Sequence, residues 1–294
     1  MEKMLIRGGV LLTAVLLVLG CRQEQTSVAE KNVVELAYVD WSTEVASTNM
    51  VRAVLQEKLD YEVNLKSMSA SRMWQAVASG EADAMVAAWL PTSYGHYLEE
   101  MQHQVVDLGP NLEQTRIGLA VPAYVTIDAI PQLGEHAERF AGRIVGIDPG
   151  AGLMARTEQA VREYGLEDFT LIAGRESTMI AALEEAIQSN KWIVVTAWTP
   201  HWKFARWDLK YLEDPGKIYG GAEEIHTIVR SGLDQEMPEV YLFLKAFQWS
   251  PADMNQVMAW NREEGADPYE SAKRWMRENP EKVENWLPGR INSR

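Results

Sequence analysis

The sequence is poor in cysteine and in positive charge. Its 294 residues include one cysteine, Cys21, so a disulfide within the chain is excluded. The formal net charge is -14, and no cluster of lysine and arginine provides the basic surface that nucleic acid requires. We therefore expect no nucleic-acid partner, and we attribute the acidity mainly to solubility.

The motifs of common enzymes are also missing. The sequence has no G-x-S-x-G, no phosphate-binding G-x-x-x-x-G-K-[ST], no G-x-G-x-x-G after a strand and no H-E-x-x-H. His96 and His103 could form a metal pair on one helix face, but a solvated amphipathic helix is the simpler interpretation. We expect no catalytic residues, no metal and no cofactor.

The first 20 residues have the pattern of a secretory signal peptide. A cationic start precedes an apolar stretch over residues 8–20, which is shorter than the ~20 residues that span a bilayer. Its end, "LVLGC", resembles a bacterial lipobox, which predicts lipidation of Cys21, and the alternative is a free thiol or an intermolecular bridge. Residues 21–32 are polar and predict a tether.

Strand and helix patterns alternate after the tether and then repeat. The predicted strands are 33–39, 61–68, 83–89, 142–148, 169–174 and 192–198, and the helices between them are 47–59, 71–79, 153–164 and 178–188. This order predicts βαβ units, hence an α/β fold with mostly parallel sheets flanked by helices. From Pro238 onward the pattern is helical.

The two sets of elements resemble each other in sequence. The segment "MWQAVASGEADAMVAAWLP" is similar to "MIAALEEAIQSNKWIVVTAWTP". Trp89 and Trp198, near the ends of these segments, lie 109 residues apart. We therefore predict two similar lobes. The predicted division is lobe 1 over 33–118, lobe 2 over 119–224 and a return to lobe 1 with C-terminal helices over 225–294, with crossings at 116–125 and 225–233.

Tryptophan is abundant, with eleven residues against five phenylalanines, and three tryptophans stand where strands should end: Trp41, Trp89 and Trp198. Open α/β sheets bind ligands at the carboxyl ends of their strands, and an aromatic face attracts a cation. A lid on the core or a platform for sugar rings are the alternatives. The other tryptophans are interpreted as packing residues: Trp74, Trp192, Trp202, Trp207, Trp249, Trp260, Trp275 and Trp286.

The segment "GIDPGAGLM" places glycines directly before a predicted helix. The free N–H groups of a helix N-terminus can hold an anion. Aromatic faces for a cation and amides for a carboxylate together predict a small zwitterion with a quaternary ammonium group.

Several phrases resemble a known family: "LAYVDWSTEVASTNMV", "MVAAWLP", "DLGPNL", "GIDPGAGLM", "VVTAWTPHW", "DLKYLEDP" and "GGAEEIHTIVRSGL". They are similar to the glycine betaine-binding lipoproteins of ABC-type osmoprotectant importers, the OpuAC-like group, from about Val33 to Trp286. The resemblance implies a two-lobed clamshell of the type II periplasmic binding protein class. It further implies a non-enzymatic protein, monomeric when free and lipid-anchored on the extracytoplasmic face, which delivers betaine to a permease and its ATPase.

The resemblance also assigns the binding residues. The ammonium cage is implied to be Trp41, Trp89 and Trp198, and the carboxylate is implied to be held by the backbone N–H groups of Gly152 and Leu153. A histidine of the family falls on Tyr94 here, with His96 two residues further on. The Tyr94 hydroxyl could donate, His96 could replace it, or this contact could be missing.

Other ligands and functions stay open at this point. Proline betaine and dimethylsulfoniopropionate carry the same two groups as glycine betaine, whereas choline lacks the carboxylate. An enzyme acting on betaine-like substrates and a ligand-sensing module are alternatives from other classes. We expect neither, because no general base or nucleophile is recognised near the tryptophans and no signalling domain is recognised in the sequence.

Overall fold

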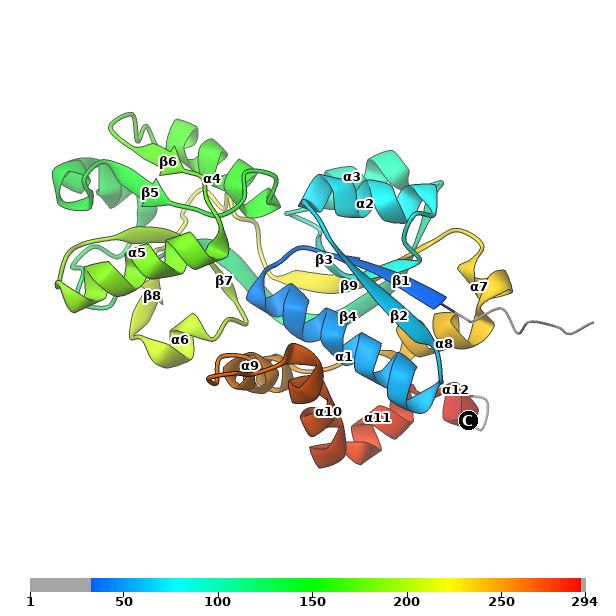
Figure 1. Ribbon diagram of the computed structural model, residues 1–294. Coiled ribbons are helices and arrows are strands. Elements are labelled where there is room, and N and C mark those ends of the chain that lie inside the picture. The colour runs from blue at the N-terminus through cyan, green and yellow to red at the C-terminus, as the bar shows by residue number, and fades with distance from the viewer. Residues whose placement is uncertain (1–32, 292–294) are drawn as a thin grey trace, which may run out of the picture. The chain divides into compact units, whose positions relative to one another are not determined.

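The computed structural model describes residues 33–291 (Figure 1). The predicted signal peptide, the tether and Cys21 lie outside the described residues. Among the helices of this range, none is both long enough and apolar enough to cross a bilayer.

The described chain consists of alternating strands and helices followed by a run of helices. The strands are β1 (Val33–Tyr38), β2 (Glu62–Ser67), β3 (Ala84–Leu90), β4 (Val105–Pro122), β5 (Arg143–Val145), β6 (Thr170–Ile172), β7 (Val194–Thr199), β8 (Leu209–Tyr211) and β9 (Glu223–Arg230). The helices are α1 (Ser42–Lys58), α2 (Ala70–Ser79), α3 (Gly95–Met101), the 3-10 helix η1 (Ile130–Phe140), α4 (Gly152–Glu163), α5 (Glu176–Gln188), α6 (Lys203–Arg206), α7 (Leu233–Glu236), α8 (Pro238–Ala246), α9 (Pro251–Trp260), α10 (Pro268–Glu278), α11 (Pro280–Trp286) and α12 (Pro288–Ile291).

One long strand, β4, connects two lobes. The strand order is β2-β1-β3-β9-β4-β7-β5-β6, and β8 also pairs with β4. The N-terminal part of β4 pairs with β9 as far as Thr115, and from Arg116 onward β4 pairs with β7. We call the part built on β1, β2, β3 and β9 lobe 1, and the part built on β5 to β8 lobe 2.

Each lobe has a three-stranded parallel part. In lobe 1, β1 lies between β2 and β3, and in lobe 2, β5 lies between β6 and β7. Strand β4 pairs antiparallel with its neighbours, and β9 pairs antiparallel with β3. Both sheets are therefore mixed, since the chain must cross between the lobes in both directions. The predicted two-lobed α/β fold is confirmed, and the equivalent positions of β3 and β7 explain the repeated tryptophan phrase.

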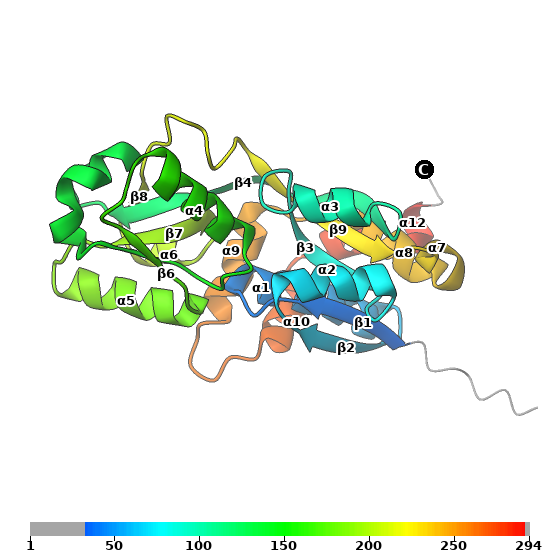
Figure 2. The ribbon, with the colours of Figure 1, turned by 90° about the horizontal axis from the view of Figure 1, so that it is seen from above.

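Helices cover both faces of the lobe 1 sheet. Helices α2 and α3 lie on one face, and α1 with the C-terminal helices lies on the other (Figure 1). The view from above separates α5 of lobe 2 from β1 and β2 of lobe 1 (Figure 2). Under α1, the C-terminal helices bury a tryptophan stack in which the rings of Trp275 and Trp286 lie 5.6 Å apart and nearly parallel. These tryptophans pack in the core, as the sequence indicated.

Three details differ from the prediction. The second crossing precedes Glu223, because β9 pairs only with strands of lobe 1, so residues 225–233 do not cross. Helix α3 ends at Met101, so His96 and His103 do not share one helix face. Helix α1 begins at Ser42, five residues earlier than expected. The predicted limits of the lobes, 33–118 and 119–224, stay predictions.

Candidate functional site

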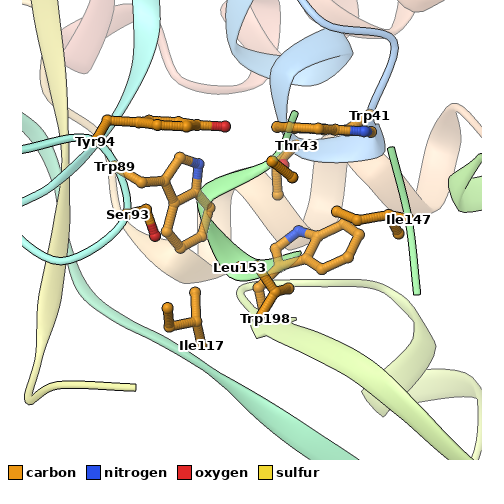
Figure 3. Close-up of a pocket in the computed structure, with 10 residues that line it drawn as sticks. Trp41, Thr43, Trp89, Ser93, Tyr94, Ile117, Ile147, Leu153 and Trp198 are labelled. Carbon is orange, nitrogen blue, oxygen red and sulfur yellow. The ribbon is translucent and has the colours of Figure 1, made fainter. Parts of the chain in front are cut away.

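Three tryptophans from three strand ends enclose one cavity. Trp41 directly precedes α1, whereas Trp89 and Trp198 are the penultimate residues of β3 and β7. Their indole rings surround a common space (Figure 3). The three side chains are at most 5% exposed, so a ligand here would be largely removed from water.

Lobe 2 contributes the N-terminus of a helix to the same cavity. Ala151 and Leu153, which flank the first residue of α4, both line it. The first N–H groups of a helix have no partner within the helix, so this end of α4 can accept an anion. The remaining walls are formed by Thr43, Ser93, Tyr94, Ile117 and Ile147.

Tyr94 lines the cavity and His96 does not. The Tyr94 hydroxyl points toward the space between the indoles (Figure 3) and accepts a hydrogen bond from the backbone N–H of Gly152. Burial raises the pKa of Tyr94 well above its usual range, so the hydroxyl keeps its proton and can donate it to a ligand oxygen. The His96 side chain is exposed on α3, where its ring lies 4.0 Å from that of Tyr97.

Two of the three indole N–H groups donate to carboxyl groups. Trp41 Nε1 donates to Asp148 Oδ2 at 2.8 Å, and Trp89 Nε1 donates to Glu44 Oε1 at 3.0 Å. These bonds fix the orientation of both rings. Burial raises the pKa of Glu44 to about 8, with a further contribution from the nearby Glu176 carboxylate, so Glu44 is protonated at neutral pH.

The two lobes touch through a carboxylate at the start of α1. Glu176 of lobe 2 accepts hydrogen bonds from the backbone N–H of Ser42 at 2.8 Å and from the Ser42 hydroxyl. Trp202 Nε1 also donates to Ser42 Oγ at 3.0 Å. Because Glu176 satisfies a free N–H of the first turn, α1 can begin at Ser42 without a local capping side chain. This explains the early start that the sequence around Ser42 did not reveal.

A second contact between the lobes depends on a glycine. A Cβ added at Gly152 would lie 2.4 to 2.7 Å from backbone atoms of Ser93 in lobe 1. Beside it, Arg156 Nη2 of α4 donates to the carbonyl oxygen of Thr92 at 2.8 Å. The lobes therefore approach each other closely on both sides of the cavity, and Gly152 permits the approach near Tyr94.

The sequence indicated the tryptophans and the α4 N-terminus but missed their supports. Asp148, Glu44 and Glu176 carry no signal in the sequence, because each contacts a residue at least 45 positions away. The "DPG" phrase that contains Asp148 predicts an anion site at a helix N-terminus and gives no role to the Asp148 side chain. Its carboxylate holds Trp41 instead.

The fold and the site define the class of protein. Two α/β lobes joined by crossing strands, with the site between them, are the arrangement of type II periplasmic binding proteins. Residues 32–278 match the family described as the substrate binding domain of the ABC-type glycine betaine transport system, and the chain belongs to this family.

Solved structures with the same fold come from several bacteria. Lactococcal OpuAC, crystallised in its closed-liganded conformation with glycine betaine, is 39% identical with a TM-score of 0.83, and the match covers 87% of this chain and 99% of that one. The glycine/betaine/L-proline-binding protein of Borrelia burgdorferi is 38% identical with a TM-score of 0.85, covering 89% and 98%. A choline binding protein in complex with choline is 27% identical with a TM-score of 0.82, covering 88% and 92%.

A curated relative matches over a shorter region. The glycine betaine/carnitine transport binding protein of Listeria monocytogenes is 44% identical over 164 residues, which are 55% of this chain. This region spans about half, 53%, of the length of the Listeria protein.

The raised pKa of Glu44 predicts a pH-dependent effect of Glu44→Gln. Burial raises the pKa of Glu44 in the folded chain to about 8, from the value of 4.5 that it has when unfolded. The contribution of Glu44 to stability therefore falls as the pH rises from about 4.5 to 8. Glutamine has no such loss. Urea unfolding should therefore show the variant gaining stability relative to wild type between pH 5 and pH 8.

The control is Glu99→Gln, because Glu99 is exposed on α3. Its difference from wild type should be the same at both pH values. A constant difference for Glu44→Gln as well would contradict the assignment of a protonated Glu44.

Proposed function

We propose that this chain is the extracytoplasmic solute-binding protein of an ABC transporter, and that it binds glycine betaine or a close quaternary-ammonium carboxylate such as proline betaine for osmoprotectant uptake. The observation that carries the proposal is the meeting of Trp41, Trp89 and Trp198 around one buried cavity that also receives the N-terminus of α4. Membership of the glycine betaine family and the glycine betaine named in the lactococcal structure support the same ligand.

The tryptophans suit an ammonium group that has no N–H to donate. Such a cation cannot form a hydrogen bond with an oxygen acceptor, but it is attracted by the faces of aromatic rings. Each aromatic face contributes about 0.5 to 2 kcal/mol to binding. Burial of the three rings removes the water that would otherwise compete. We use the name cage for Trp41, Trp89 and Trp198 from here on.

The carboxylate has its donors on the other side of the same space. In the proposed complex it accepts hydrogen bonds from the backbone N–H of Leu153, from the hydroxyl of Tyr94, and from the backbone N–H of Gly152, which would turn to the ligand from the Tyr94 oxygen that it contacts here. The α4 N-terminus lies beside the cavity and the Tyr94 hydroxyl points toward it, which supports this orientation. Because choline lacks a carboxylate, it should bind more weakly than the betaines.

Closure of the lobes would couple the ligand to transport. Trp198 and α4 belong to lobe 2, whereas Trp41, Trp89 and Tyr94 belong to lobe 1, so both ends of the ligand would bridge the lobes. The contacts of Ser42 with Glu176 and of Thr92 with Arg156 would hold the closed form. The closed, monomeric protein, anchored by a lipid on Cys21 at the outer face of the membrane, would then deliver betaine unchanged to the permease and its ATPase.

The substitution Trp198→Ala removes one wall of the cage. We expect the affinity for glycine betaine to fall by about tenfold or more, since one aromatic face and its apolar contact are lost. Isothermal calorimetry measures the change, and Trp192→Phe, which alters a tryptophan packed on Phe140 away from the cavity, is the control. Equal affinity of Trp198→Ala and wild type would disprove the cage.

The substitution Gly152→Ala tests closure. Its Cβ would meet the Ser93 backbone, so the lobes could not approach as they do here, and we expect betaine affinity to fall by about tenfold to a hundredfold. Gly150→Ala is a matched control, because a Cβ there meets no atom within 4 Å. If both variants bind betaine alike in a fluorescence titration, the close contact of Gly152 with Ser93 has no part in binding.

The substitution Tyr94→Phe removes a single hydroxyl from the cavity. We expect glycine betaine to lose about fivefold to tenfold in affinity through the missing hydrogen bond, while choline, which has no carboxylate, keeps its own affinity. Parallel calorimetric titrations of the variant with both ligands give the comparison. A loss that is equal for the two ligands would place Tyr94 at the ammonium end instead.

A further inference from the structure

A lysine lies behind one wall of the cage. Lys203, the first residue of α6, is 0% exposed, and its Nζ lies 4.0 Å from the centre of the Trp198 ring. Lys203 does not line the cavity, so its ammonium contacts this ring from outside the ligand space. The ring of Trp198 therefore lies between the proposed site of the ligand's cation and the ammonium of Lys203, and both can interact with the same π system.

The Lys203 ammonium has no direct polar partner. Within residues 33–289, whose side chains the structure describes, Nζ makes no hydrogen bond and no carboxylate oxygen lies within 4.0 Å of it. A lysine is almost never fully buried unless it is paired, because an unpaired charge in the interior is costly. The ring of Trp198, with that of Phe204 at 5.4 Å, is the main interaction the charge has.

The charged groups around Lys203 come from the neighbouring elements. Glu176 at the start of α5 attracts the Lys203 charge, but burial dominates and lowers the pKa of Lys203 to about 7. On the turn before α6, burial lowers the pKa of His201 to about 4, and the Lys203 charge adds to this effect. His201 is thus neutral at pH 7, with Nδ1 accepting from the Lys203 backbone N–H at 3.0 Å and Nε2 donating to Glu176.

The remaining charges are engaged elsewhere. Arg262, from the turn after α9, lies 3.9 Å above the ring of Trp202 rather than that of Trp198. Arg206, on α6 itself, pairs with Glu184 of α5 at 2.7 Å. On α1, Glu44 contacts Trp89 and acts on Glu176, not directly on Lys203. Among these groups, Lys203 is the one whose charge lies against the ring of Trp198.

The three cage rings consequently differ in their electrostatic support. The indole N–H groups of Trp41 and Trp89 donate to the carboxyl groups of Asp148 and Glu44, whereas Trp198 carries a cation against its ring. A cation on one face of an aromatic ring reduces the attraction of the ring for a second cation and repels that cation through space. Trp198 is therefore the wall whose strength depends on a titratable cation.

We propose that Lys203 is a positioning residue that couples betaine binding to a proton: its ammonium competes with the ligand's trimethylammonium group for Trp198, so the ligand binds more tightly when Lys203 is neutral and binding releases a proton from Lys203. The inference rests on the proposed function, because it requires a cationic ligand in the cage. It adds a pH dependence that neither the ligand nor the cage tryptophans possess.

The direction of the pH dependence follows from the charge of Lys203. Well below pH 7 the lysine is charged in the free protein and opposes the ligand. Well above pH 7 it is neutral and the opposition disappears. Betaine affinity should therefore rise by about tenfold between pH 6 and pH 8.5, with proton release greatest near neutral pH.

Calorimetric titration of glycine betaine tests this in wild type, Lys203→Met and Lys203→Arg at pH 6 and pH 8.5. Methionine has a similar length and no charge, so Lys203→Met should bind tightly at both pH values. Arginine keeps its charge, so Lys203→Arg should bind weakly at both. Titrations near pH 7 in two buffers of different ionisation enthalpy should show more proton release for wild type than for either variant.

Lys273→Met is the matched control, because Lys273 lies 4.8 Å from the ring of Tyr269 on α10, away from the cavity. It should keep the wild-type pH profile, and circular dichroism checks that every variant is folded. Wild-type binding that is equal at both pH values and releases no proton would overturn the inference while leaving the proposed function intact. Absence of betaine binding by wild type at both pH values would overturn both.

Discussion

A quaternary ammonium ion has no N–H to donate, and this constraint determines what the rest of the structure must do. Selectivity over water has to come from several aromatic faces around one dry space. No single strand end can supply them, so Trp41 and Trp89 come from lobe 1 and Trp198 comes from lobe 2. The proposed site is complete only when the lobes meet.

The contacts between the lobes therefore belong to the recognition chemistry as much as the cage does. Trp41 donates to Asp148 of the opposite lobe, so one bond both orients a cage ring and joins the lobes. Ser42, the next residue, is held by Glu176, and Gly152 leaves room for the backbone of Ser93. Because these contacts lie directly beside the cavity, ligand binding and closure would be coupled through a few neighbouring residues.

The sequence predicted the parts of this site that repeat or follow strand ends. The phrases around Trp89 and Trp198 match because β3 and β7 hold equivalent places in two lobes of the same topology. Trp41 and the α4 N-terminus were found because each follows a clear strand pattern. The position of Tyr94 against the N–H of Gly152 needed the structure, since it depends on how closely the lobes approach.

The supporting charges could not be predicted from the sequence. Glu176 meets Ser42 from 134 residues away, and no local pattern marks a carboxylate for such a contact. The same contact explains why α1 begins earlier than predicted, because the group that caps this helix comes from the other lobe. No pattern in the sequence marks Lys203, and only the fold shows its ammonium against Trp198.

The central claim is that aromatic faces, rather than hydrogen bonds, select the cationic end of the ligand. Calorimetric titration with glycine, N-methylglycine, N,N-dimethylglycine and glycine betaine tests it most directly, because these ligands share one carboxylate and differ only in the number of N–H groups. The account predicts that affinity rises with each methyl group and is highest for glycine betaine. Equal or tighter binding of glycine or N-methylglycine would contradict it, since the cavity would then have to accept hydrogen bonds from the ammonium group.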